Sequence, residues 1–199
     1  MLEDDAMSVR LAGIKAMSFF GKQCVDIRKT CLNFLIDMLN DEIDSVRIAA
    51  LYGIQSFNEV LTLNDYEVDT VLFSLSEDNS KLREAIYQFF KEITVNQAPL
   101  FQKILDKIFI NLGRFKQQDR DKIFSLVQRL GKTHSKIVQG IYYKILGIDK
   151  RFLAKEPDWN DLVYIAKMIL MYSAAEIQPS MLIECPNFFG KHVNYLRDQ

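Results

Sequence analysis

The stretch SVRIAAL, residues 45–51, decides the fold because it is one of three related copies in the chain. An earlier copy reads SVRLAGI at residues 8–14, and a looser one reads KLREAIY at residues 81–87. Successive copies begin 37 and 36 residues apart. A self-similar period of this length, with helical patterning inside it, is typical of stacked helical hairpins. The sequence therefore predicts an all-α fold, an α-solenoid of stacked antiparallel helical hairpins.

Each copy has the pattern of a helix that begins just after an acidic or amide turn. Asp, Asn and Ser side chains at such positions accept hydrogen bonds from the free N–H groups of the first helical turn. In the second copy, apolar and small residues recur at helical spacing, and we expect this face to be buried. Its members are Val46, Ala49, Ala50, Gly53, Ile54 and Phe57.

One arginine occupies the same register in every copy: Arg10, Arg47 and Arg83. In a stack, these arginines would lie one above another, near turn carboxylates such as Asp41 and Asp44 of a neighbouring repeat. Charge-assisted hydrogen bonds can form there. The alternative is that each arginine is solvated and has no structural role. The repetition in register favours a structural ladder.

The repeated phrase resembles the second helix of HEAT repeats, in which an acidic turn precedes Val-Arg and small or aliphatic residues. The resemblance implies a HEAT-type or armadillo-like solenoid. A single hairpin cannot bury its apolar face alone, so hairpins stack and generate an extended surface. Such surfaces bind partners, and we expect a scaffold and not an enzyme.

Short motifs along the rest of the chain carry a second resemblance. They are Arg120–Phe124, Gly131–His134, Glu156–Asp158, Asp161, Tyr164–Ala166 and Tyr195–Asp198, together with Asn40–Arg47. In this order they resemble the middle of a family of HEAT-repeat subunits of the Integrator complex. Trp159 and Leu162 depart from the family's pattern.

The second resemblance implies a nuclear scaffold that supports two metallo-β-lactamase-type cleavage subunits, one of them an RNA endonuclease. It further implies a part in small nuclear RNA 3′-end processing and in transcription attenuation. Family members contact inositol hexakisphosphate, but no residue of this chain can be matched to those contacts. We therefore assign no cofactor and leave any cofactor-binding residue unknown.

The chain is expected to fall into three parts. Residues 1–146 are predicted to form HEAT-like repeats, residues 147–160 a linker, and residues 161–199 further helices that continue the solenoid. Residues 161–175 are apolar nearly all round, which predicts a buried helix. A last short helix is expected near Phe188–Leu196. Because the first phrase belongs to the second helix of a repeat, we expect a piece of a longer array.

Two finer expectations concern helix packing and helix ends. Cys24 and Cys31 are seven residues apart on a predicted helix, and we interpret both as core residues on one stripe with Ile27 and Met38. Gly131 is expected to divide a helix at residues 119–130 from one at residues 134–146.

Charge is unevenly distributed, although the formal net charge is only −1. Residues 1–102 carry a net charge of −7, whereas residues 103–151 carry +8. Such a reversal can steer an acidic partner, for example RNA, inositol polyphosphate or an acidic protein surface. The best candidates for a focused patch flank one predicted inter-helix turn: Arg129, Lys132, His134 and Lys136. The alternative is that these cations decorate unrelated faces and are merely solvated.

No residue pattern indicates catalysis. Neither His134 nor His192 has a further ligand at metal-binding spacing, and no Gly-rich phosphate loop is present. The sequence therefore predicts no catalytic residue and no metal site. It also lacks a secretory signal and a long apolar span, so no membrane partner is expected. Two rival functions stay open: a HEAT adaptor of another assembly, and a protein that binds RNA or polyphosphate through residues 103–151.

Overall fold

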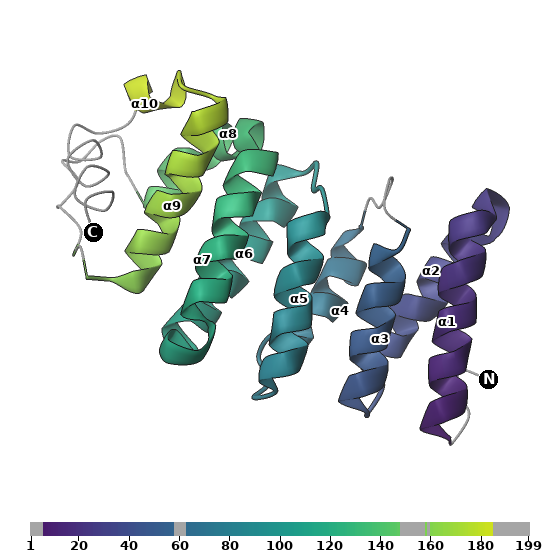
Figure 1. The fold of residues 1–199 in the computed structure, drawn as a ribbon. Coiled ribbons are helices and arrows are strands. Elements are labelled where there is room, and N and C mark those ends of the chain that lie inside the picture. The colour runs from purple at the N-terminus through teal and green to yellow at the C-terminus, as the bar shows by residue number, and fades with distance from the viewer. Residues whose placement is uncertain (1–5, 58–62, 148–157, 159, 185–199) are drawn as a thin grey trace. The chain divides into compact units, whose positions relative to one another are not determined.

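The computed structural model describes residues 6–57, 63–147, 158 and 160–184 (Figure 1). Within these ranges the secondary structure is helical, which confirms the predicted all-α solenoid. The chain divides into two compact units, Met1–Thr94 and Val95–Gln199. Most of the predicted linker at residues 147–160 and the whole expected helix at Phe188–Leu196 lie outside the described residues.

The first unit stacks helices in two layers. α1 (Met7–Gln23), α3 (Asp44–Gln55) and α5 (Ser80–Glu92) form one layer in Figure 1, and α1 contacts α3, which contacts α5. α2 (Val25–Asp37) and α4 (Asp65–Ser74) form the other layer. A short 3-10 helix, η1 (Met38–Asn40), extends α2 toward the turn before α3.

The core of the first unit is built on the predicted face of the repeated phrase. Val46, Ala50, Gly53, Ile54 and Phe57 are buried, and Ala49 beside them is half-buried. The glycine allows α1 to approach closely, because a Cβ at Gly53 would lie 2.4 Å from Ser18 Oγ. Apolar spacing thus selects the buried face, and small residues set how near the neighbouring helix comes.

The prediction for the stripe on α2 is partly wrong. Cys31 is buried, but Cys24 is exposed and Ile27 is 43% exposed. Cys24 precedes the helix in extended conformation, because α2 begins only at Val25. The buried face of α2 is instead completed toward its C-terminal end by Leu35 and Ile36.

The second unit contains five helices within the described residues. α6 (Ala98–Arg114) and α8 (Ser135–Leu146) form one layer, while α7 (Lys116–Thr133) and α9 (Leu162–Ile177) form the other (Figure 1). α10 (Met181–Glu184) follows α9. Pro99 lies in the first turn of α6, where its missing N–H leaves no helical bond unmade. One apolar face of α6 is buried: Leu100, Phe101, Ile104, Leu105, Ile108 and Leu112.

Gly131 does not divide two helices, because α7 continues through it to Thr133. Its role is close packing against α9. A Cβ at Gly131 would lie 2.4 Å from the carbonyl oxygen of Leu170 and 2.9 Å from Ser173 Cβ. The glycine that resembled a helix breaker is therefore the contact point of the most extensive helix pair in this unit.

α9 is the buried helix that its composition predicts. The carboxylate of Asp161 accepts a hydrogen bond from the N–H of Val163 at 3.0 Å and so caps the helix start. Ala166, Leu170 and Met171 are fully buried against α7 and α8. In the part of the chain that the structure describes, no helix has both the length and the apolarity needed to cross a bilayer.

Replacing Gly131 in α7 and Gly140 in α8 by alanine should change stability in opposite directions. Gly131→Ala places a methyl group against the α9 backbone, and we expect a loss of about 1–3 kcal/mol in the free energy of unfolding. Gly140→Ala meets no atom within 4 Å and should stabilise α8 by about 0.5–1 kcal/mol. Urea unfolding followed by circular dichroism measures both, and effects of the same sign would contradict the packing described here.

Candidate functional site

Arg10 on α1 is paired with a carboxylate in the turn before α3. Its Nε lies 2.9 Å from Asp41 Oδ2, and its Nη2 donates to Asp41 Oδ1 at 3.3 Å. The two side chains are only 9% and 7% exposed. Asp41 Oδ1 also accepts a hydrogen bond from the N–H of Ile43 at 2.9 Å, which fixes the carboxylate in the turn. The pair therefore joins α1 to the turn that precedes α3, the next helix of the same layer.

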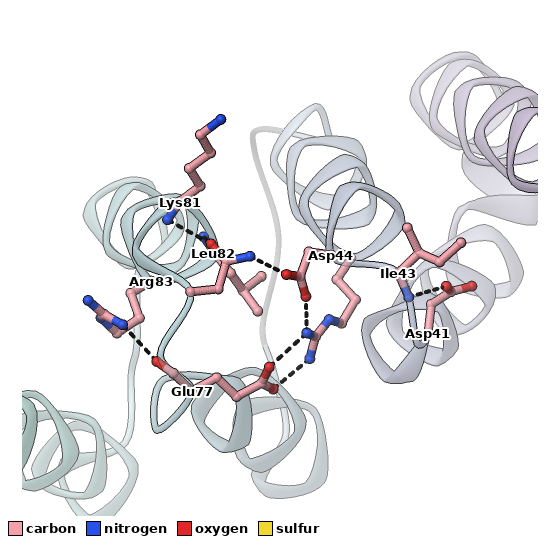
Figure 2. A network of polar contacts seen from close by, with 9 residues as sticks. Asp41, Ile43, Asp44, Glu77, Lys81, Leu82 and Arg83 are labelled. Atoms are coloured by element: carbon pink, nitrogen blue, oxygen red, sulfur yellow. Dashed lines mark hydrogen bonds and ion pairs between the residues drawn. The ribbon is translucent and has the colours of Figure 1, made fainter.

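Arg47 on α3 makes the equivalent link to the turn before α5. Its Nη1 lies 2.5 Å from Glu77 Oε1, and its Nη2 donates to Glu77 Oε2 at 2.7 Å, so the pair is bidentate. Nη2 also donates to Asp44, whose second oxygen accepts from the side-chain amide of Asn79. Figure 2 shows the carboxylates of Asp44 and Glu77 joined through this network.

The two links have the same register along the chain. The paired residues are 31 positions apart for Arg10 and Asp41, and 30 positions apart for Arg47 and Glu77. Asp41 precedes Arg47 by six residues, and Glu77 precedes Arg83 by six. Asp41 and Asp44 were predicted from the sequence, whereas Glu77 was not. Glu77 can be found from the sequence because, like Asp41, it lies six residues before the arginine of a copy of the phrase.

Arg83 differs from the other two arginines. It is fully buried, and its Nη1 donates to the backbone carbonyl of Glu77 at 2.7 Å (Figure 2). This bond holds the turn before α5 in place. The same turn carries the Glu77 carboxylate, which pairs with Arg47. Arg47 and Arg83 therefore both bind Glu77, one through its side chain and the other through its backbone.

The network favours the charged forms of its members. Hydrogen bonds from Arg47 hold the pKa of Asp44 below its usual value. Hydrogen bonding to Glu77 raises the pKa of Arg47. Both groups are therefore ionised at neutral pH, and their hydrogen bonds are charge-assisted.

Removing the charge of Asp41 should weaken the first unit. In Asp41→Asn the buried guanidinium of Arg10 loses its ionic partner, and we expect the free energy of unfolding to fall by about 1–3 kcal/mol. Glu42→Gln removes the same charge from the next, exposed residue and should change stability by no more than about 0.5 kcal/mol. Chemical denaturation of the two variants measures the difference, and equal effects would remove the structural role of the pair.

Three of the four residues of the predicted acidic-partner patch are exposed cations. Arg129 and Lys136 are exposed. Lys132 is exposed as well, but its Nζ lies 2.9 Å from Glu176 Oε2 on α9. A pair in which both side chains are 42% exposed contributes little to stability. Lys132 is nevertheless partly neutralised, so the outward positive charge comes from Arg129 and Lys136.

His134 is buried, and its assignment to that patch is wrong. Its Nε2 accepts a hydrogen bond from the N–H of Val95 at 2.9 Å, and its ring stacks on Phe101 with centroids 4.8 Å apart. The other ring nitrogen, Nδ1, lies 3.2 Å from the carbonyl oxygen of Leu130. Because α7 runs to Thr133, the histidine falls at the helix end with its ring turned into the core.

Burial makes His134 a source of pH-dependent stability. Desolvation lowers its pKa, since the charged ring would be buried and its Nε2 could no longer accept from Val95. Below about pH 6.5 the unfolded state binds a proton that the folded state resists. The free energy of unfolding should therefore fall as pH drops from about 7 to about 5.

The free energy of unfolding of two variants, measured over the same pH range, shows whether His134 causes this pH dependence. His134→Gln should flatten the pH dependence of unfolding between those limits, even though the variant is less stable overall. His192→Gln removes the other histidine and is measured alongside it for comparison. A slope that persists in His134→Gln would show that other groups cause it.

A cavity of about 410 Å³ lies between α6, α8 and α9 in the second unit. Leu105, Phe109 and Ile145 contribute apolar walls, and Lys144 and Lys167 contribute positive charge. The Nζ of Lys167 lies 5.8 Å from the centroid of the Phe109 ring. Asp106 also lines the cavity, and burial raises the pKa of this carboxyl group. The cavity suits a group that has an apolar part and an anionic part. Lys144 belongs to the basic segment of residues 103–151, but no pattern in the sequence indicates the cavity.

Comparison with known proteins gives these surfaces a context. Residues 31–61 match the family model of the HEAT repeat, and they include α3 with Arg47 and Asp44. The chain is also 30% identical over 197 residues to Integrator complex subunit 4 of Xenopus laevis and of Homo sapiens, and 27% identical to that of Drosophila melanogaster.

The likeness to Integrator complex subunit 4 extends over nearly all of this chain but not over the relatives. The matches cover 99% of the chain and 20%, 20% and 19% of the three proteins. The chain thus spans about a fifth of the length of the curated relatives it matches. Both resemblances found in the sequence, to HEAT repeats and to this subunit, are confirmed. Among the described residues, no group of three or more His, Cys, Asp or Glu side chains could hold a metal ion.

Proposed function

We propose that this chain is a non-catalytic HEAT-repeat scaffold of the Integrator complex that supports its RNA-cleavage module in the nucleus. The observation that carries the proposal is the likeness to Integrator complex subunit 4 over 99% of the chain, together with the stacked helical hairpins. In this role the chain binds protein subunits, and catalysis belongs to its partners.

The inter-repeat arginine links suit a scaffold. A surface that spans several repeats binds well only if neighbouring helices keep a fixed register, since ordering them during binding would cost affinity. The pairs Arg10–Asp41 and Arg47–Glu77 fix that register before any partner arrives. The first unit can therefore present a preorganised surface.

The partners that fit this role are the two metallo-β-lactamase-type subunits of the complex. Under the proposal, one of them cuts nascent RNA, and the assembly processes small nuclear RNA 3′ ends and attenuates transcription. The chain supplies binding surface and rigidity. It takes no direct part in the metal chemistry.

A second candidate function is direct binding of RNA or an inositol polyphosphate. The observation that favours it is the net charge of +8 on residues 103–151, where Arg129 and Lys136 are exposed on the surface. Binding of this kind weakens steeply with salt, because each phosphate contact releases counterions. A protein interface with an apolar centre would depend less on salt.

Affinity purification of the tagged chain from nuclear extract, with bound proteins identified by mass spectrometry, tests the proposal. We expect the two metallo-β-lactamase-type subunits to be recovered and to survive nuclease treatment. Recovery of RNA without those subunits would favour the second candidate, and recovery of an unrelated assembly would overturn the Integrator assignment.

Two charge-reversal variants define the basic surface in the same experiment. Arg129→Glu with Lys136→Glu should leave folding intact, because both side chains are exposed, and should weaken any acidic partner. Lys22→Glu with Lys29→Glu is the matched control on exposed residues of the first unit. Equal recovery from both variants would show that Arg129 and Lys136 do not contact the partner.

A further inference from the structure

α4 presents two large aromatic side chains to solvent. Tyr66 and Phe73 are 64% and 76% exposed, whereas Val68, Val71 and Leu72 on the same helix are buried. The two aromatic residues are seven positions apart, which is close to two helical turns, so they share one outward face. Apolar residues scattered singly on a surface are ordinary, but a matched pair on one helix face indicates a contact surface.

The start of α4 is held firmly, so this face has a defined geometry. The side chain of Asn64 accepts a hydrogen bond from the N–H of Glu67 at 3.0 Å, and Glu67 Oε2 accepts from the N–H of Asn64 at 2.8 Å. The reciprocal capping bonds account for the burial of Glu67. They do not involve Tyr66 or Phe73.

The stretch of sequence that contains α4 is acidic. Residues 48–80 contain six Asp and Glu residues and no Lys or Arg. Asp69 is exposed and lies three positions after Tyr66 and four before Phe73, so it is a helical neighbour of both rings. Asp65 is exposed in the same first turn. Along this face, the position of Asp69 lies between those of the aromatic residues Tyr66 and Phe73.

We propose that this acidic aromatic face, formed by Tyr66, Asp69 and Phe73 with Asp65 beside them, binds an arginine-bearing segment of a partner protein. A guanidinium group stacks on aromatic rings and donates two parallel hydrogen bonds to a carboxylate, which is the combination that this face offers. A lysine ammonium group is a point charge that cannot make the bidentate contact. Nucleic acid is disfavoured because its phosphates would meet carboxylates.

The test uses the full chain and a fluorescent peptide in which arginine alternates with glycine, and it measures fluorescence anisotropy at low and at physiological salt. The variant Tyr66→Ala with Phe73→Ala should weaken binding of this peptide about tenfold, because it removes two cation–π contacts. Asp69→Asn should weaken it as well. A peptide with lysine in place of arginine should bind several-fold more weakly to the unchanged chain, for about the same total charge.

Matched control variants distinguish binding at this face from nonspecific electrostatic attraction of the peptide to an acidic protein. Tyr52→Ala removes an aromatic ring that is 55% exposed on α3, and Asp26→Asn removes an exposed carboxylate on α2. Neither should change the affinity for the arginine peptide. Equal affinity of the unchanged chain and the double aromatic variant would overturn the proposal, and so would an equal loss in the control variants. Because all the substituted side chains are exposed, thermal unfolding should be little changed in every variant.

Discussion

The first unit depends on a bidentate pair between the guanidinium of Arg47 and the carboxylate of Glu77. The side chain of Arg47 is only 12% exposed, so its charge is largely removed from water and needs partners. Glu77 lies in the turn of the next repeat, 30 residues further along the chain. The partner can be reached only when α3 and α5 stack in one register. The same constraint acts one repeat earlier, where Arg10 meets Asp41.

This constraint explains why the sequence reveals the fold so readily. A charge pair that recurs in two successive repeats requires the arginine and its carboxylate at fixed positions, and the copies of the phrase display that periodicity directly. The apolar spacing within the second copy then identifies the buried face from Val46 to Phe57, which the structure bears out. Local pattern and global stacking agree here, as expected of a repeat protein.

The parts that the sequence did not reveal depend on contacts between residues far apart in the chain. Glu77 was missed because the third copy of the phrase is loose, and its neighbours Asp78 and Asn79 resembled the expected acidic turn. Gly131 resembled a helix end, but its lack of a side chain serves the contact with Leu170. His134 stands among lysines in the sequence, yet its hydrogen bond with Val95 buries it. No local pattern encodes these partners.

Each unit carries features suited to a different kind of partner. The first has an aromatic face on α4 in an acidic stretch, and the second has exposed cations and a cavity lined by Lys144 and Lys167. Opposite charge on the two units favours different partners for each, since like charges repel and unlike charges steer association.

A double-mutant cycle on Arg47 and Glu77 tests the central claim, which is that the arginine of one repeat is bound to the turn of the next. The unfolding free energies of Arg47→Gln, Glu77→Gln and the double variant are compared with that of the unchanged chain. We expect a coupling energy of about 1 kcal/mol or more, because the two side chains interact directly. Effects that add within about 0.3–0.5 kcal/mol would contradict it.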